Sequence, residues 1–240
     1  MHVVFRESHG LDEGAAAFDL GQSPADLVVL SFSDSDLGAF AAGYGRAKAQ
    51  GAELPSVRLA SLMALKHPLS VDTYVENTLA GAKGILVRLI GGQSYWPYGL
   101  ASLADLARKK GIALAVLPAD GRDDTNLDAL STLPISTLRQ LQHLCDAGGA
   151  VAAQAALAQL ALAAGIYASP VLGAKTVPDC GWYLDGNISA DLPALQSGPR
   201  VAVTFYRSYV TSADLAPIDA LMAQLRARGF VPVGLSLIHI

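Results

Sequence analysis

Short apolar runs alternate with helical patterns along the first half of the chain, and this alternation constrains the fold more than any other feature. Runs typical of strands occupy residues 26–30, 57–60, 84–90 and 112–117. Between them, apolar side chains recur every three or four residues, which indicates helices. Strand–helix–strand units at this spacing predict a parallel sheet, and near-continuous apolar strands predict that helices cover both faces. The sequence therefore predicts an α/β fold, an open parallel sheet of βαβ units with helices on both faces.

The second half of the chain has a different sequence pattern. An amphipathic segment at 136–146 precedes an Ala-rich helix that ends near 164, and several prolines follow. A strand pattern at 200–206, a helix that we expect Ser212 to cap and a strand from residue 230 then form one more βαβ unit, which cannot bury both faces of its own sheet. We expect an N-terminal α/β domain at 1–197, with a sheet part at 1–120, a helical part at 121–168 and an irregular linker at 169–197, and a truncated second α/β domain at 198–240.

Composition narrows the class of protein. Hydrophobic residues make up 52% of the 240 residues and charged residues 16%, against about 25% charged in an average soluble domain. The net charge of -4 argues against nucleic acid as a partner. Two cysteines are too few for a disulfide scaffold and favour a reducing compartment.

The uncharged stretch 147–174 is long enough to span a bilayer, but it is mostly Ala and Gly, so we expect a buried helix and no membrane span.

The sequence contains no phosphate-binding loop, no nucleophile elbow and no His-Glu-x-x-His pattern. We therefore expect no ATP hydrolysis by this chain and no preformed metal site. The remaining candidates are polar and aromatic residues that follow the predicted strands, because ligands of open parallel sheets bind beyond the carboxyl ends of the strands.

Three stretches meet that condition, and each has a structural alternative. Residues 31–36 could bind a ligand or cap the next helix. Residues 91–98 combine glycines with aromatic rings, and could form a binding surface or a turn packed on a neighbouring domain. Residues 207–209 could grip a carboxylate or form a surface or inter-domain ion pair. The candidate substrate-binding residues are Ser33, Asp34, Tyr95, Trp96, Arg207 and Ser208.

Several segments together resemble a known family. LVVLSFSDSDL at 27–37, HPLSVD at 67–72, VRLIGG at 87–92 with the aromatic residues that follow, and LPADG at 117–121 occur in this order. The series resembles the N-terminal region of the cobaltochelatase large subunit, CobN. VTFYRS at 203–208 resembles the opening strand of the next region, which is shared with the large subunit of magnesium chelatase.

The resemblance implies a function. The family inserts Co²⁺, a substrate of the reaction, into the tetrapyrrole hydrogenobyrinic acid a,c-diamide during aerobic cobalamin biosynthesis in the cytoplasm. A separate AAA+ ATPase subunit and an integrin-like middle subunit are the implied partners, and the ATPase hydrolyses the ATP. A magnesium-chelatase-type large subunit, a non-catalytic docking domain for the ATPase subunits and a freestanding flavodoxin-like domain are the alternatives.

The resemblance has limits that bear on the site. Family members exceed a thousand residues, and the regions credited with macrocycle and metal binding lie mostly downstream, so no catalytic residue is assigned. Residues 235–240 do not continue as the family would, and we expect this tail to be foreign to it. Our hypothesis is that Tyr95, Trp96 and Arg207 face the substrate cavity or the domain contact beside it.

Overall fold

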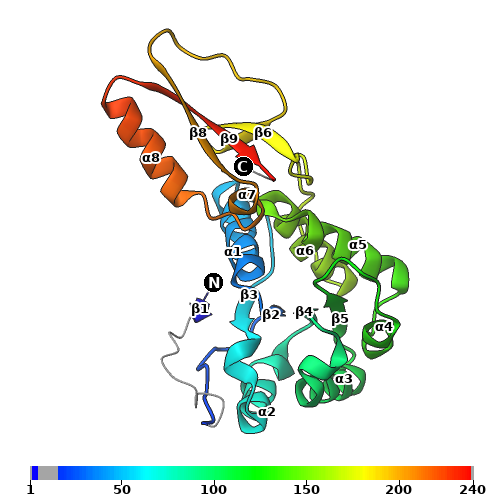
Figure 1. Ribbon diagram of the computed structural model, residues 1–240. Helices are drawn as coiled ribbons and strands as arrows, with labels where there is room; N and C mark the ends of the chain where they lie inside the picture. Colours follow the sequence, from blue (N-terminus) through cyan, green and yellow to red (C-terminus); the bar gives the residue numbers. More distant parts are fainter. Residues whose placement is uncertain (1, 5–15, 239–240) are drawn as a thin grey trace.

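The computed structural model describes residues 2–4 and 16–238, and its larger part is built on a parallel sheet (Figure 1). All strand pairs of this sheet are parallel, in the order β1-β3-β2-β4-β5. The strands are β1 (His2–Val4), β2 (Leu27–Ser31), β3 (Val57–Ser61), β4 (Gly84–Leu89) and β5 (Ala113–Pro118). The predicted α/β fold with a parallel sheet is confirmed, and β1 adds a strand that the sequence did not predict.

Helices cover both faces of this sheet. Strand residues such as Val28 and Leu30 pack with α2 (Pro68–Asn77) and α3 (Pro97–Lys110) on one face. Their neighbours, Leu27 and Val29 among them, face the other way and pack with a second set of helices. This set comprises α1 (Asp34–Ala49), α5 (Ile135–Ala147) and α6 (Gly149–Ala163). The short helix α4 (Thr125–Leu130) follows β5. Three 3₁₀ turns complete the region, namely η1 (Leu62–Leu65), η2 (Leu79–Gly81) and η3 (Gln93–Tyr95).

The Ala-rich helix α6 is buried, as expected, between α1, α5 and the sheet. Its small side chains let α1 approach closely at Gly43. A Cβ atom at Gly43 would lie 2.6 Å from the backbone nitrogen of Gln154, so a larger residue would force the two helices apart. Across the described residues, no helix combines the length and apolar character that crossing a membrane requires.

A second, smaller sheet contains the C-terminal part of the chain. Its order is β7-β6-β9-β8, with β8 and β9 parallel and the β6 pairs antiparallel. Its strands are β6 (Cys180–Leu184), β7 (Asn187–Ser189), β8 (Arg200–Tyr206) and β9 (Val231–Leu237), with α7 (Ser208–Thr211) and α8 (Ala216–Ala227) between the last two. The parallel pair β8–β9 with its helix is the predicted βαβ unit.

Two details differ from the sequence-based expectations. The expected irregular linker at 169–197 contains the hairpin β6–β7, because Asp185 and Gly186 both have positive φ, 48° and 81°, as a two-residue hairpin turn requires. Ser212 does not begin the next helix but is the C-cap of α7, because α8 starts later, at Ala216.

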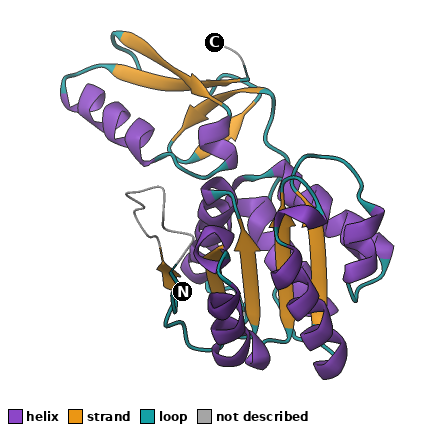
Figure 2. Ribbon diagram, turned by 60° about the horizontal axis from the view of Figure 1, so that its bottom comes forward, coloured by secondary structure: helices purple, strands orange, loops and turns teal. Residues whose placement is uncertain are grey.

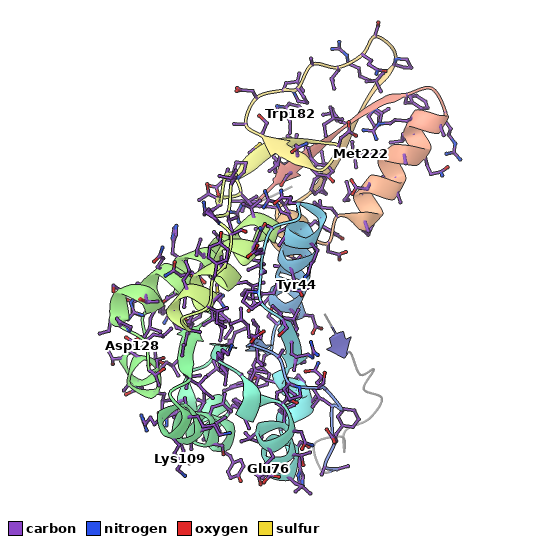
Figure 3. The ribbon with its side chains drawn as sticks, turned by 180° about the vertical axis from the view of Figure 1, so that it is seen from behind. Tyr44, Glu76, Lys109, Asp128, Trp182 and Met222 are labelled. Atoms are coloured by element: carbon purple, nitrogen blue, oxygen red, sulfur yellow. The ribbon has the colours of Figure 1, made fainter. Side chains whose placement is uncertain are left out.

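The two sheets lie end to end (Figures 1 and 2). In Figure 2 the strands of the first sheet point toward the second one. Figure 3 shows Trp182 and Met222 in the second sheet region, and Glu76 and Lys109 at the opposite end of the molecule. The position of a domain boundary, expected near residue 198, stays a prediction.

Candidate functional site

The order in which the chain adds strands to the first sheet reverses between β2 and β4. From β2 it passes through α1 to β3 on one side, and then through α2 to β4 on the other side of β2. Because β2 leads into α1 and β4 leads into α3, and these two helices cover opposite faces, the loops after β2 and β4 diverge and leave a crevice at the carboxyl ends of the two strands. Such a topological switch point is where open α/β sheets bind ligands. The last residue of β2, Ser31, pairs in register with Arg88 of β4.

Arg88 is the central residue of this crevice. It is 4% exposed and points to the face of the sheet that α1, α5 and α6 cover. Its Nη1 donates to Asp146 Oδ1 of α5 at 2.8 Å, and its Nε lies 3.4 Å from Asp36 Oδ2 of α1. The Ser31 hydroxyl also donates to Asp36 Oδ2, at 2.9 Å. A buried charge needs such partners, and here one arginine links the sheet to two helices.

The groups around Arg88 keep its guanidinium charged although it is buried. Burial lowers the pKa of Arg88, but the nearby Cys145, Asp36 and Asp146 outweigh burial and raise the pKa above its usual value. Burial raises the pKa of the Cys145 thiol to about 12, although the nearby Arg88 lowers it. At neutral pH Arg88 is therefore a charged guanidinium and Cys145 a neutral thiol.

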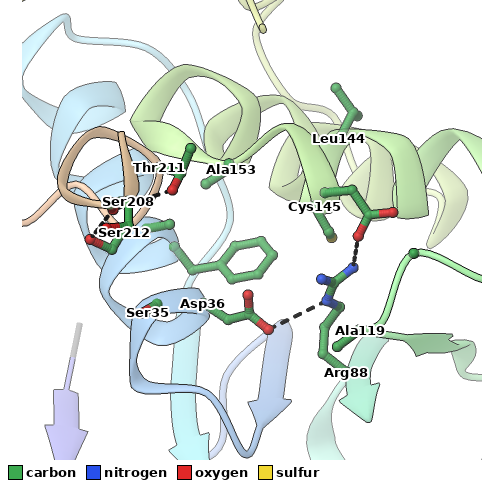
Figure 4. A pocket seen from close by; sticks show the side chains of 15 residues that line it. Ser35, Asp36, Arg88, Ala119, Leu144, Cys145, Ala153, Ser208, Thr211 and Ser212 are labelled. Carbon is green, nitrogen blue, oxygen red and sulfur yellow. Dashed lines mark hydrogen bonds and ion pairs between the residues drawn. The ribbon is translucent and has the colours of Figure 1, made fainter. Parts of the chain in front are cut away.

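A cavity of about 330 Å³ opens beside Arg88, between the first sheet and α7 (Figure 4). Such a volume is at the lower end of the range for small-molecule sites. The wall consists of residues from the first sheet region and from α7 and its end, namely Ser35, Asp36, Ala39, Phe40, Arg88, Ala119, Gly121, Leu144, Cys145, Asp146, Gly148, Ala153, Ser208, Thr211 and Ser212.

Of the residues predicted to bind substrate, Ser208 lines this cavity. Ser33 instead caps α1, where its Oγ accepts a hydrogen bond from Asp36 N at 3.2 Å, and Asp34 is exposed in the first turn of the same helix. Arg207 donates to the carbonyl oxygens of Val177 at 2.7 Å and Pro178 at 3.1 Å. Its guanidinium thus holds the segment before β6.

The two aromatic candidates lie apart from the cavity wall. Tyr95 is 60% exposed, and its ring packs edge-on against Phe32 with centroids 5.0 Å apart. Trp96 is 4% exposed, and its indole N–H donates to the Leu65 carbonyl at 2.8 Å. Trp96 is therefore a core residue of the first sheet region, and the substrate-binding roles of the six candidates stay predictions.

Sequence reasoning missed Arg88, Asp146 and Cys145. A signal existed for Arg88, because it is the single charged residue in the apolar run 84–90 and a charge inside a buried strand requires a polar partner. Asp36 stood within a candidate stretch but was not chosen. For Asp146 and Cys145, at the end of an amphipathic helix, the sequence carries no comparable signal.

A second cavity, of about 270 Å³, lies at the carboxyl ends of β4 and β5. Asp120, Arg122, Asp123 and Asp124 line it, and Asp124 caps α4 through its Oδ1. Within the part of the chain that the structure describes, no group of three or more His, Cys, Asp or Glu side chains could hold a metal ion.

Comparisons with known proteins bear on the function. No protein-family model matches the chain. Two curated proteins named aerobic cobaltochelatase subunit CobN are similar to it. The protein from Sinorhizobium sp. is 36% identical over 95% of this chain and 19% of its own length. The protein from Pseudomonas aeruginosa is 34% identical over 99% of this chain and 19% of its own length.

A solved structure shows the same fold. The catalytic subunit of cobaltochelatase from Mycobacterium tuberculosis matches 88% of this chain with a TM-score of 0.66, at 22% identity and over 16% of that subunit. The chain thus spans about a fifth of the length of the curated relatives that it matches. The resemblance to the cobaltochelatase large subunit that the sequence predicted is confirmed.

Proposed function

Because the chain is related to the aerobic cobaltochelatase subunits named CobN, we propose that it is part of the large subunit of a cobaltochelatase. The observation that supports this function is sequence identity of 36% along nearly the whole chain. The reaction we propose for the complete subunit is insertion of Co²⁺ into hydrogenobyrinic acid a,c-diamide in aerobic cobalamin biosynthesis, with Co²⁺ and the macrocycle both as substrates.

The proposed machinery divides the work between subunits. An AAA+ ATPase subunit hydrolyses ATP, an integrin-like middle subunit links it to the large subunit, and the complex works in the cytoplasm. The sequence of this chain has no phosphate-binding loop motif, which accords with placing ATP on a partner. Within this chain, the crevice at the switch point is the place where we expect contact with a substrate or with the rest of the subunit.

A chimeric subunit tests this function directly. This chain replaces the matching segment of the Sinorhizobium protein, and the purified chimera is mixed with that organism's partner subunits, ATP, Co²⁺ and the macrocycle. We expect ATP-dependent cobalt insertion, followed by the change in the absorption spectrum of the macrocycle. The intact Sinorhizobium subunit is the positive control, and a subunit that lacks the segment is the negative control.

A chimera that folds and binds its partner subunits, but inserts no cobalt, would contradict the proposed function. A parallel reaction offers the chimera Mg²⁺ and protoporphyrin, and metal insertion there in place of cobalt insertion would assign the segment to a magnesium-chelatase-type subunit. Both reactions are followed by the absorption spectrum of the macrocycle.

A further inference from the structure

The second sheet ends in a strand whose outer edge is free. In the order β7-β6-β9-β8, β8 is the last strand, and among the described residues it pairs with β9 alone (Figure 1). The Val231 N–H of β9 donates to the Pro199 carbonyl, and the Arg207 N–H donates back to β9. Backbone groups of alternate residues point to opposite sides of a strand, so the N–H and C=O groups of Ala202 and Thr204 point to the free edge.

The other edges of the two sheets are short or covered. β1 and β7 have three residues each. The outer edge of β5 is covered, because Leu114 N donates to Thr132 Oγ1 at 2.8 Å and Val116 N donates to Ser131 Oγ at 2.9 Å. In contrast, β8 has seven residues, and 201–206 contain no charge and no proline. β8 therefore lacks the features that keep edge strands from pairing with another strand.

One face of β8 is open as well. Val203 and Phe205 pack into the core around Met222 of α8. Ala202 and Thr204 lie on the opposite face and are exposed. A pair of parallel strands is normally covered by helices on both faces. In the described structure the β8–β9 pair thus has a free edge and an uncovered face.

The first sheet shows how such a pair is completed. β2, α1 and β3 form a parallel unit of the same kind as β8, α8 and β9. The chain then adds α2 and β4, with β4 at the other edge of β2 and α2 on the face opposite to α1. Crossovers between parallel strands keep the same hand. A further helix and strand on the second sheet would therefore take the corresponding places, on the open face and at the free edge of β8.

We propose that the free edge of β8 binds a parallel strand from the part of the large subunit that lies outside this chain. The inference rests on the proposed function, because the chain spans about a fifth of the length of its curated relatives and the rest of such a subunit supplies the strand. α7 follows β8 and lines the cavity beside Arg88. A strand parallel to β8 would end beside α7, so that a second switch point would face the first across this cavity.

Hydrogen exchange at single amides tests the pairing. It is measured for the 240-residue chain and for the chimeric subunit of the cobalt assay, both without Co²⁺, macrocycle and ATP. We expect the amides of Ala202, Thr204 and Tyr206 to exchange at least about 100-fold more slowly in the chimera, because paired amides exchange only when the pairing opens. The amides of Val203 and Phe205, which point to β9, are the internal control and should be protected in both proteins.

A proline at the free edge locates the contact. Thr204→Pro removes an N–H that points away from β9, so the isolated chain should keep its circular dichroism spectrum and the protection of Val203 and Phe205. In the chimera the same change should abolish the added protection of Ala202 and Tyr206. Thr204→Ala is the matched control, because it shortens the side chain but retains the N–H, and it should keep the full protection.

Three results would overturn the proposal. A folded chimera in which Ala202 and Thr204 exchange as fast as in the isolated chain would show that the edge stays free. Equal protection in the Thr204→Pro chimera would show that the protection does not come from pairing with β8. A dimer of the isolated chain in which the same amides are already protected would assign the edge to a second copy.

The exchange and cobalt assays separate this inference from the proposed function. A chimera that inserts cobalt while the edge of β8 stays free contradicts the inference alone. A chimera that protects the edge of β8 but inserts no cobalt contradicts the proposed function alone.

Discussion

The two sheets of this chain differ in how completely they are covered. In the first sheet every residue of β2, β4 and β5 is buried, and helices pack on both faces. In the second sheet β8 is largely exposed, with Phe205 as its one buried residue. Among the described residues, the core of the second sheet has four buried members, Tyr183, Phe205, Val210 and Met222.

This difference indicates which part of the chain contributes most to its stability. Burial of apolar surface is the main favourable contribution to folding, and the first sheet region contains far more of it. Regions with few buried apolar contacts open at a lower free energy than the rest of the molecule. We therefore expect the second sheet region to unfold before the first, and the following predictions test that order.

The largest effect is expected for Leu86→Ala in the first sheet. Leu86 is fully buried in the centre of β4, against α1, α5 and α6. Removal of a fully buried leucine side chain leaves a cavity and should lower the free energy of unfolding by about 3 to 5 kcal/mol. Chemical denaturation, followed by circular dichroism at 222 nm, measures the change. A loss below 1 kcal/mol would show that the first sheet tolerates repacking and is not the rigid part of the molecule.

A smaller and more local effect is expected for Met222→Ala in the second sheet region. Met222 is the one buried residue of α8. Its truncation in so small a core should lower the free energy of unfolding by about 2 kcal/mol. Hydrogen exchange should accelerate in β8 and β9 and stay unchanged in β2 and β4. The neighbouring Leu221→Ala, at a side chain that is 47% exposed, is the matched control. Equal acceleration in both sheets would show that they unfold as one unit.

The same contrast explains how much of the fold the sequence predicted. The near-continuous apolar runs of β2, β4 and β5 identified a parallel sheet, because strands buried on both faces cannot alternate with polar residues. The hairpin β6–β7 was missed although its turn, Asp185–Gly186, has the dipeptide typical of such turns. Its strands are short and half exposed, so their residues lack a hydrophobic pattern that would have drawn attention to the turn.

The candidate site was predictable in its place but not in its residues. The rule that ligands bind beyond the carboxyl ends of parallel strands led to the crevice after β2 and β4. The sequence could not show that Trp96 is buried, because it does not reveal that the carbonyl group of Leu65 lies within reach of the indole N–H. Asp146 reaches Arg88 from a helix 58 residues away along the chain, and one sequence cannot show such a long-range pair.

Cysteine titration gives a third test, with an expected effect of about 1 kcal/mol. Burial raises the pKa of Cys145 in the folded chain to about 12, while in the unfolded chain the thiol titrates near 9. The contribution of the Cys145 thiol to the free energy of unfolding is therefore fully present below pH 9 and is lost as the pH rises toward 12. Between pH 8 and pH 10 the free energy of unfolding should fall by about 1 kcal/mol more in the parent chain than in Cys145→Ala.

The second cysteine supplies the control for this titration. Cys180 is exposed at the start of β6, so Cys180→Ala should retain the same dependence on pH as the parent chain. Denaturation midpoints at pH 8, 9 and 10 provide the measurement. If Cys145→Ala loses as much stability over this range as the parent chain, the thiol is not the group that titrates.

The smallest effect is expected at an ion pair on the surface of the second sheet region. Arg226 Nη2 of α8 lies 2.7 Å from Asp185 Oδ1 in the turn of the β6–β7 hairpin, and both side chains are well exposed. Exposed pairs gain little, because water and salt screen the charges and two long side chains must be ordered. Arg226→Gln should lower the free energy of unfolding by less than about 0.5 kcal/mol, and raising the salt concentration in the parent chain should reproduce that change. A loss above 2 kcal/mol would mean that this pair, and not the small apolar core around Met222, fastens α8 to the hairpin, and the stability contrast between the two sheets would then rest on electrostatics.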